Sequence, residues 1–108
     1  MTPQVLQVTY TFHGSRADFE RDFAPAAYDI ARAHGLRWKI WLFDEAQSRG
    51  GGTYLFDDET SLRAFADGPV IAALRSHGSF SDITAQVFSV LDGPTEITRG
   101  PVPAAVGR

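Results

Sequence analysis

The chain has 108 residues, enough for one domain with a modest hydrophobic core, and its formal net charge is −3. It has no block of basic residues, which argues against binding to nucleic acid or to an anionic membrane surface. It has no cysteine, which excludes disulfides, thiolate catalysis and iron–sulfur ligation, and no apolar stretch long enough to span a bilayer. We therefore expect a small cytoplasmic protein.

The first predicted element is a strand over residues 5–12, because apolar and polar residues alternate there. Its buried face would consist of Leu6, Val8, Tyr10 and Phe12. A helix should follow, since Ser15 and Asp18 form a capping pattern and apolar residues then recur at helical spacing. Pro25 should kink or divide this helix, and Gly35 should end it.

Residues 36–44 predict a second strand, because the stretch is short and rich in aromatic and branched side chains. Simple alternation gives this strand a wholly apolar face and a mixed face. The apolar face would hold Leu36, Trp38, Ile40 and Leu42, and the mixed face Arg37, Lys39, Trp41 and Phe43. A loop containing the first glycines of the run 50–52 should connect it to a short strand over residues 52–56 in an antiparallel hairpin.

The next predicted element is a helix that begins after Asp57 or Asp58, either of which can cap it. A second helical piece should start at Pro69, and a final strand should span residues 83–91. Gly and Pro dominate the end of the chain, so we expect a domain over residues 1–92 and an extended or disordered arm over residues 93–108.

The order strand, helix, strand, strand, helix, strand is typical of an α+β, ferredoxin-like split βαβ fold. Its four-stranded antiparallel sheet would carry helices on one face only. The other face would display Trp41, Phe43 and Phe88, an apolar patch larger than monomers usually leave exposed. We therefore predict a homodimer that packs sheet against sheet.

Three stretches, WKIW, GGTYLF and DDETS, resemble the YdhR-like monooxygenases, a branch of the dimeric α+β barrel superfamily. The residues that carry the resemblance are Trp38, Lys39, Trp41, Gly51, Gly52, Tyr54, Leu55, Phe56, Asp58, Glu59 and Ser61. The resemblance implies a dimeric barrel and the oxidation of a small aromatic or polyketide-like phenol without metal or flavin. We accordingly expect no cofactor.

Such chemistry needs a base to ionise the substrate and donors to hold the resulting anion in a dry pocket. Histidine is the usual base near neutral pH, so His13 and His77 are the candidates, with Tyr10 and Trp38 as catalytic donors. The substrate-binding candidates are Phe12, Lys39, Tyr54 and Phe65. Structural roles stay open: His77 could complement a helix end, His13 could occupy a surface turn, and Tyr10 and Trp38 could bond to backbone within a solid core.

No pair of histidines has the spacing of metal ligands, so we expect no metal site. Two other functions fit the same pocket. An isomerase, cyclase or dehydratase would use the stabilised anion without oxygen, and a ligand-binding or stress-response protein would bind an aromatic ligand without turnover.

Overall fold

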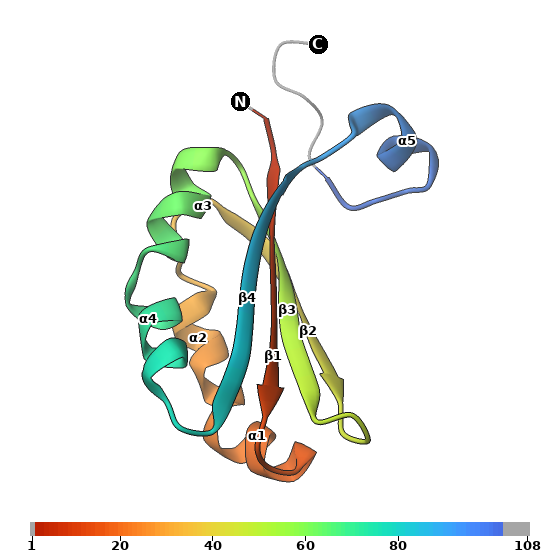
Figure 1. Ribbon diagram of the computed structural model, residues 1–108. Helices are drawn as coiled ribbons and strands as arrows, with labels where there is room; N and C mark the ends of the chain where they lie inside the picture. Colours follow the sequence, from red (N-terminus) through yellow and green to blue (C-terminus); the bar gives the residue numbers. More distant parts are fainter. Residues whose placement is uncertain (1, 103–108) are drawn as a thin grey trace.

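The computed structural model describes residues 2–102 as four antiparallel strands, with the helices that connect the strands packed against one face of the sheet (Figure 1). The strands are β1 (Gln4–Phe12), β2 (Leu36–Asp44), β3 (Arg49–Phe56) and β4 (Phe80–Ser89), in the order β2-β3-β1-β4. The helical elements are α1 (Arg16–Asp22), the 3-10 turn η1 (Ala24–Ala26), α2 (Ala27–Ile30), α3 (Glu59–Ala66), α4 (Pro69–Ser76) and α5 (Asp92–Ile97). The ferredoxin-like α+β prediction is confirmed.

The helices begin where the capping residues predict. Ser15 and Asp18 form a capping box at the start of α1, each side chain accepting a hydrogen bond from the other residue's backbone N–H. Pro25 lies in η1 and divides the first helical segment into α1 and α2. Asp58 rather than Asp57 caps α3, because its side chain accepts from the Ser61 N–H at 2.8 Å.

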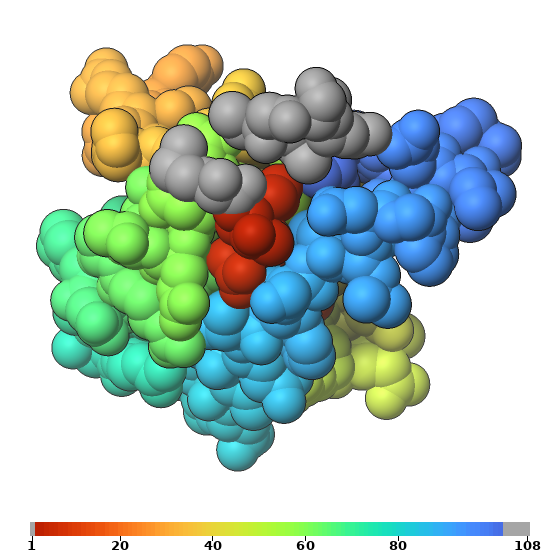
Figure 2. Space-filling view, turned by 90° about the horizontal axis from the view of Figure 1, so that it is seen from above, coloured from red at the N-terminus to blue at the C-terminus, as the bar shows by residue number. Residues whose placement is uncertain are grey.

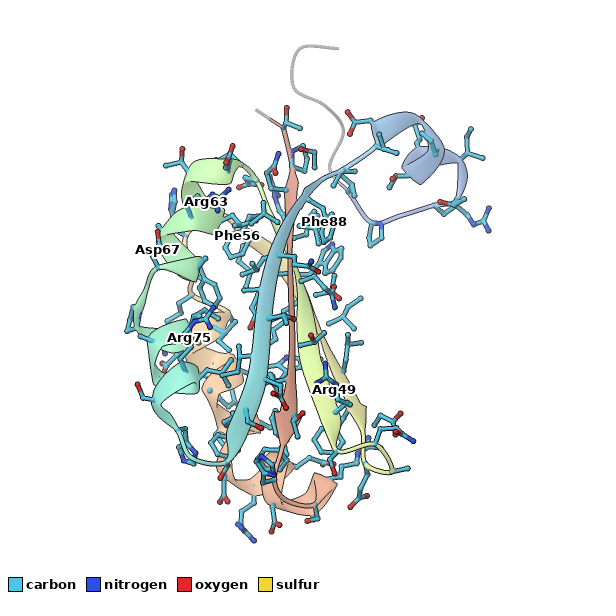
Figure 3. All side chains as sticks on the ribbon, in the orientation of Figure 1. Arg49, Phe56, Arg63, Asp67, Arg75 and Phe88 are labelled. Carbon is cyan, nitrogen blue, oxygen red and sulfur yellow. The ribbon has the colours of Figure 1, made fainter. Side chains whose placement is uncertain are left out.

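The core lies between the helices and one face of the sheet. The predicted inner face of β1 is confirmed, since all four of its even-numbered apolar residues are buried. Phe56 and Leu62 complete the centre of the core, and both are fully buried. Figure 3 shows Phe56 directed toward the helices and Phe88 on the opposite side of the sheet. We call these two sides the helix face and the open face.

The predicted faces of β2 are wrong, because a β-bulge at the start of the strand shifts the alternation. Leu36 pairs with Phe56, but Trp38 pairs with Leu55, so the strand holds one extra residue between them. Beyond the bulge, Lys39, Trp41 and Phe43 lie on the helix face. Trp38, Ile40 and Leu42 lie on the open face.

The surface predicted for dimerisation changes accordingly. Trp41 and Phe43 are not on the open face, because they pair with Gly52 and Gly50, whose neighbours on β1 belong to the helix face. Phe43 packs against the buried Phe12 instead, with ring centroids 6.0 Å apart. Phe88 lies on the open face as predicted and is 51% exposed. Ile40, on the opposite edge strand β2, is equally exposed on that face.

The segment after β4 reaches across the end of the sheet. It forms α5 and then returns, so that the Trp38 indole N–H donates to the Pro101 carbonyl oxygen at 2.7 Å. Because β4 and β2 are the two edges of the sheet, residues 92–101 connect one edge to the other. Figure 2 shows the start of the chain between α3 and the end of β4, with α5 farther to the side. The segment is therefore not extended throughout, and residues 103–108 of the predicted arm lie outside the described residues.

Within residues 2–102, no helix has both the length and the apolar character that crossing a membrane requires.

Candidate functional site

A cavity of about 610 Å³ lies between the helix face of the sheet and the helices. Residues of β1, β2, β3 and β4 form its floor, and residues of α1, η1, α2 and α4 form its walls. The lining is mostly apolar and aromatic, with few polar groups. This size and composition are typical of sites that bind small aromatic molecules.

The glycine run at the start of β3 keeps this floor open. Residues 49–51 belong to the strand rather than to the predicted loop, and Gly50 and Gly52 lie on the helix face. A Cβ atom on Gly52 would lie 2.5 Å from Cε of Lys39, and one on Gly50 would lie 2.8 Å from Cε1 of Tyr10. Larger residues would therefore displace the two polar side chains that flank the glycines.

Lys39 extends over Gly52 into the cavity and contacts aromatic rings instead of acids. Its Nζ lies 3.3 Å from the ring centroid of Trp41 and 4.5 Å from that of Tyr54. No carboxylate of residues 2–102 forms an ion pair with it. Burial lowers the pKa of Lys39 to about 7. Near neutral pH, a large fraction of this amine is therefore unprotonated and can accept a proton.

Tyr10 and Tyr54 place two hydroxyl groups in the same cavity. Both residues are buried, yet no described residue forms a hydrogen bond with either hydroxyl. Neither oxygen is sealed from solvent, because no fully buried side-chain oxygen among the described residues lacks a partner. Burial raises the pKa of Tyr10 to about 12, and burial together with Tyr10 raises the pKa of Tyr54. Both hydroxyls therefore remain donors at neutral pH.

His77 lies at the cavity, where α4 meets β4. Its ring packs edge-on against Phe23 and Phe80, with centroids 5.0 Å and 5.8 Å away. Its Nδ1 accepts a hydrogen bond from the Ser79 N–H at 3.1 Å. The neutral ring therefore carries its hydrogen on Nε2, which makes that nitrogen a donor rather than a base.

The structure separates the other predicted site residues from this cavity. His13 is exposed, and its Nε2 shares a hydrogen bond with Ser81 Oγ at 2.8 Å. Trp38 lies on the open face, so the expectation that it stands beside Tyr10 is wrong. Phe12 is buried in the core without lining the cavity. Of the predicted substrate-binding residues, only Lys39 and Tyr54 line it.

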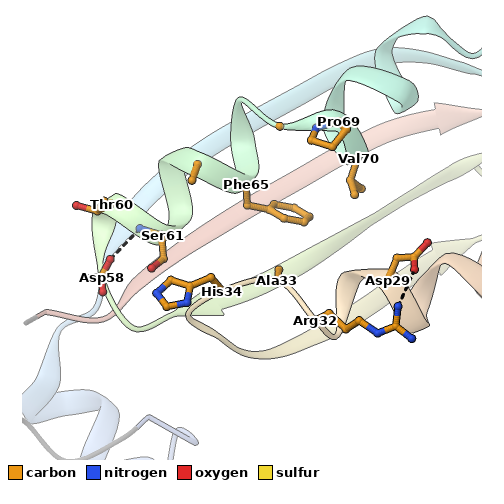
Figure 4. A pocket seen from close by; sticks show the side chains of 12 residues that line it. Asp29, Arg32, Ala33, His34, Asp58, Thr60, Ser61, Phe65, Pro69 and Val70 are labelled. Atoms are coloured by element: carbon orange, nitrogen blue, oxygen red, sulfur yellow. Dashed lines mark hydrogen bonds and ion pairs between the residues drawn. The ribbon is translucent and has the colours of Figure 1, made fainter.

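A second cavity, of about 680 Å³, opens beside the first between α2, the loop that follows it, and α3 (Figure 4). Phe65, predicted to bind substrate, lines this second cavity. His34 and Asp58 face it as well. The two cavities share Asp29, Pro69 and Val70 in their walls, so they are neighbours in the same groove between the helices.

No group of three or more His, Cys, Asp or Glu side chains within residues 2–102 is arranged to hold a metal ion.

Sequence reasoning undervalued Lys39 and misplaced the glycines. Lys39 is the only lysine in the chain, where every other Lys or Arg position is an arginine. It also stands between the chain's two tryptophans in a strand. Three consecutive glycines within reach of a predicted strand were a second signal, since glycine inside a strand often marks a close approach of other atoms.

The family model described as "Putative mono-oxygenase ydhR" matches residues 5–101. The chain belongs to this family. The match covers every strand but the first residue of β1, and every cavity residue described above. A comparison with curated protein sequences finds no significant match.

Solved structures share this fold at low sequence identity. SnoaB, a cofactor-independent oxygenase from Streptomyces nogalater, is 21% identical with a TM-score of 0.66, over 84% of this chain and 95% of that one. A protein of unknown function from Nitrosomonas europaea is 21% identical with a TM-score of 0.73, over 97% of this chain and 98% of that one. The haem degrader MhuD from Mycobacterium tuberculosis is 20% identical with a TM-score of 0.61, over 81% and 95%. At these identities the likeness establishes the fold alone.

Proposed function

We propose that this YdhR-family protein is a cofactor-independent monooxygenase that ionises a small aromatic or polyketide-like phenol and lets the anion react with dioxygen. The observation that carries the proposal is the cavity itself, in which one amine and two hydroxyls face an apolar space without hydrogen-bond or ion-pair partners among residues 2–102. The family match and the shared fold of SnoaB, which is described as a cofactor-independent oxygenase, support the reaction class.

Lys39 is the proposed base. Its neutral amine accepts the proton of the substrate hydroxyl, and the resulting ammonium stays beside the anion as its counter-ion. Burial makes the neutral amine available near pH 7, and the rings of Trp41 and Tyr54 stabilise the ammonium through cation–π contacts. Lys39 thus replaces His13 and His77 as the favoured base.

Tyr10 and Tyr54 are the proposed oxyanion donors. Their rings are held in place by burial and their hydroxyls have no acceptor among the described residues, so a bound phenolate oxygen can accept both hydrogen bonds. The anion reduces dioxygen by itself: an activated CH₂ group becomes a carbonyl, one oxygen atom enters the product and the other leaves as water. The apolar lining protects the anion from water.

We further propose that two copies pair through their open faces. Ile40 and Leu42 on β2 and Phe88 on β4 are 40–51% exposed there, at the two edges of the face, with the polar side chains of Gln7 and Thr53 on the strands between them. These exposed apolar side chains on a sheet face without helices support the sheet-to-sheet packing expected from the sequence. Sedimentation of the protein at micromolar concentration should give the mass of a dimer.

The test is oxygen consumption by metal-free protein supplied with an anthrone-like substrate. Wild-type protein should consume oxygen above the buffer rate and form the quinone, while Lys39→Met should lose about 100-fold or more of the rate. Lys39→Arg is the matched control that keeps a cation but cannot act as a base. Gly78→Ala changes a glycine with open space around it and should retain full activity. Equal rates in wild-type and Lys39→Met proteins would contradict the assignment of the base.

Oxygen removal separates this proposal from the isomerase, cyclase and dehydratase alternatives. Product formation under strict anaerobiosis would overturn the oxygenase proposal in favour of those reactions. Saturable quenching of tryptophan fluorescence with no product in either atmosphere would favour a binding protein.

A further inference from the structure

Lys39 is unusual in both sequence and place. It is the chain's only lysine, and its single amine lies in the cavity instead of on the surface. The side chain crosses Gly52 so closely that a Cβ atom at that position would meet its Cε at 2.5 Å. Its Nζ touches the faces of Trp41 and Tyr54 and forms no ion pair within residues 2–102. An amine held this way has nothing of opposite charge to keep it protonated.

We propose that Lys39 is also a nucleophile that condenses with the carbonyl carbon of aromatic aldehydes or ketones bound in the cavity, forming an imine. Nζ forms a bond to the carbonyl carbon, and the carbonyl oxygen leaves as water with two hydrogens. These hydrogens are the two that the neutral amine nitrogen originally carried. The step is redox-neutral, and it needs no co-reactant.

The neighbours of Lys39 suit each stage of this condensation. The hydroxyls of Tyr10 and Tyr54 can donate hydrogen bonds to the carbonyl oxygen, which makes the carbon more electrophilic, and then to the departing hydroxyl. The apolar lining disfavours the charged ammonium. Burial lowers the pKa of Lys39 to about 7, so the amine is neutral often enough to react at physiological pH.

The volume selects the carbonyl compound. About 610 Å³ lined by Phe19, Phe23 and Trp41 accommodates a one- or two-ring aromatic carbonyl compound. Short aliphatic aldehydes would gain little from this lining. This inference rests on the cavity of the proposed function but not on its oxygen chemistry, so either can fail alone.

The test is reductive trapping of the full chain with 2-naphthaldehyde and sodium cyanoborohydride at pH 7 in anaerobic buffer. The chain offers only two kinds of primary amine, Lys39 and the amino terminus, and peptide mapping by mass spectrometry distinguishes them. Lys39 should be labelled at least about tenfold faster than Nα-acetyl-lysine under the same conditions. An excess of 2-naphthol should protect Lys39 but not the amino terminus.

Two variants test whether the reaction takes place in the cavity. Gly52→Val should slow labelling of Lys39 at least about tenfold, because its side chain needs the space that Cε and the ligand occupy. Gly78→Ala adds a methyl group in open space and should leave the labelling rate of Lys39 unchanged. If either variant fails to fold by circular dichroism, the wild-type rate and the naphthol competition still decide the matter.

Labelling of Lys39 no faster than that of Nα-acetyl-lysine would overturn the inference, as would a failure of 2-naphthol to protect it. Trapping at Lys39 without oxygen consumption by anthrone-like substrates would refute only the oxygenase proposal. Oxygen consumption without trapping would refute only the imine.

Discussion

The two faces of the sheet differ in whether their side-chain hydroxyls form hydrogen bonds. On the open face, hydroxyl groups bond to neighbouring strands: Thr9 to Thr84 at 2.5 Å and Thr53 to Gln7 at 2.6 Å. On the helix face, Tyr10 and Tyr54 are buried residues whose hydroxyls open into the cavity and bond to no described residue. Tyr10 and Thr9 are adjacent in β1, so one step along a strand separates a paired from an unpaired hydroxyl.

This difference shows which polar groups are available to a ligand. A hydroxyl that opens into an apolar cavity and has no partner among the described residues is available to a bound ligand. The paired threonines of the open face have no unmet hydrogen-bonding need. The helix face is therefore the candidate site, and the open face is the candidate interface.

The largest effect should come from truncating the core of the helix face. Phe56 is fully buried, so Phe56→Ala should lower the free energy of unfolding by about 3–5 kcal/mol. Tyr28 in α2 is 78% exposed, and Tyr28→Ala should change it by less than about 0.5 kcal/mol. Urea denaturation measures both. Similar losses in the two variants would mean that the helices do not cover the sheet as described.

A charge on the open face should disrupt pairing of the two copies. Ile40→Asp places a carboxylate in the proposed interface, and the dimer dissociation constant should rise at least about 100-fold. Tyr28→Asp introduces the same charge on the exposed side of the helix layer and should leave the dissociation constant unchanged. Analytical ultracentrifugation over a concentration series distinguishes the outcomes, and a dimer unaffected by Ile40→Asp would exclude this face.

Removing a hydroxyl should weaken ligand binding on the helix face and lower stability on the open face. Tyr10→Phe should weaken binding of 1-naphthol by about tenfold, because the ligand loses a donor that no protein group uses. Thr84→Val should leave the affinity within about twofold and instead lower the free energy of unfolding by about 1 kcal/mol, because Thr9 loses its partner. Fluorescence titration measures the affinity of both variants, and urea denaturation measures their stability. Weaker binding by Thr84→Val than by Tyr10→Phe would contradict the prediction.

The stability of the wild type should depend on pH through Lys39. Its pKa is about 7 in the folded chain and 10.5 when unperturbed, so between these values the unfolded chain binds a proton that the folded chain has released. The free energy of unfolding should therefore rise with pH from about 7 upward. From pH 7 to 8, the wild type should gain about 1 kcal/mol relative to Lys39→Met. If the difference in free energy of unfolding between the wild type and Lys39→Met did not change from pH 7 to 8, Lys39 would be solvated.

The sequence predicted the elements well because local signals determined them. The alternation in β1, the capping pair at Ser15 and Asp18, and Pro25 each act within a few residues of their own position. The facing of β2 depended on a bulge between Leu36 and Trp38, which is set by pairing with β3 and leaves no local trace. One extra residue inverted every side chain that follows it.

The site was predicted only in part for the same reason. The face on which Tyr10 lies was predicted correctly because β1 is regular. The bulge exchanged the faces of Lys39 and Trp38, so the prediction gave Trp38 the catalytic role and Lys39 a lesser one. The choice of histidine as base followed residue type alone. The bonding of His77 Nδ1 to the Ser79 backbone depends on a turn that no spacing rule reveals.

The central claim is that Lys39 lies unpaired and desolvated beneath the helices, and one measurement tests it most directly. Because the chain has a single lysine, protein labelled with [ε-¹³C]lysine gives one side-chain resonance to follow by NMR as pH is varied. We predict a titration midpoint near 7. A midpoint close to the ordinary value of 10.5 would place the amine in water and contradict the account.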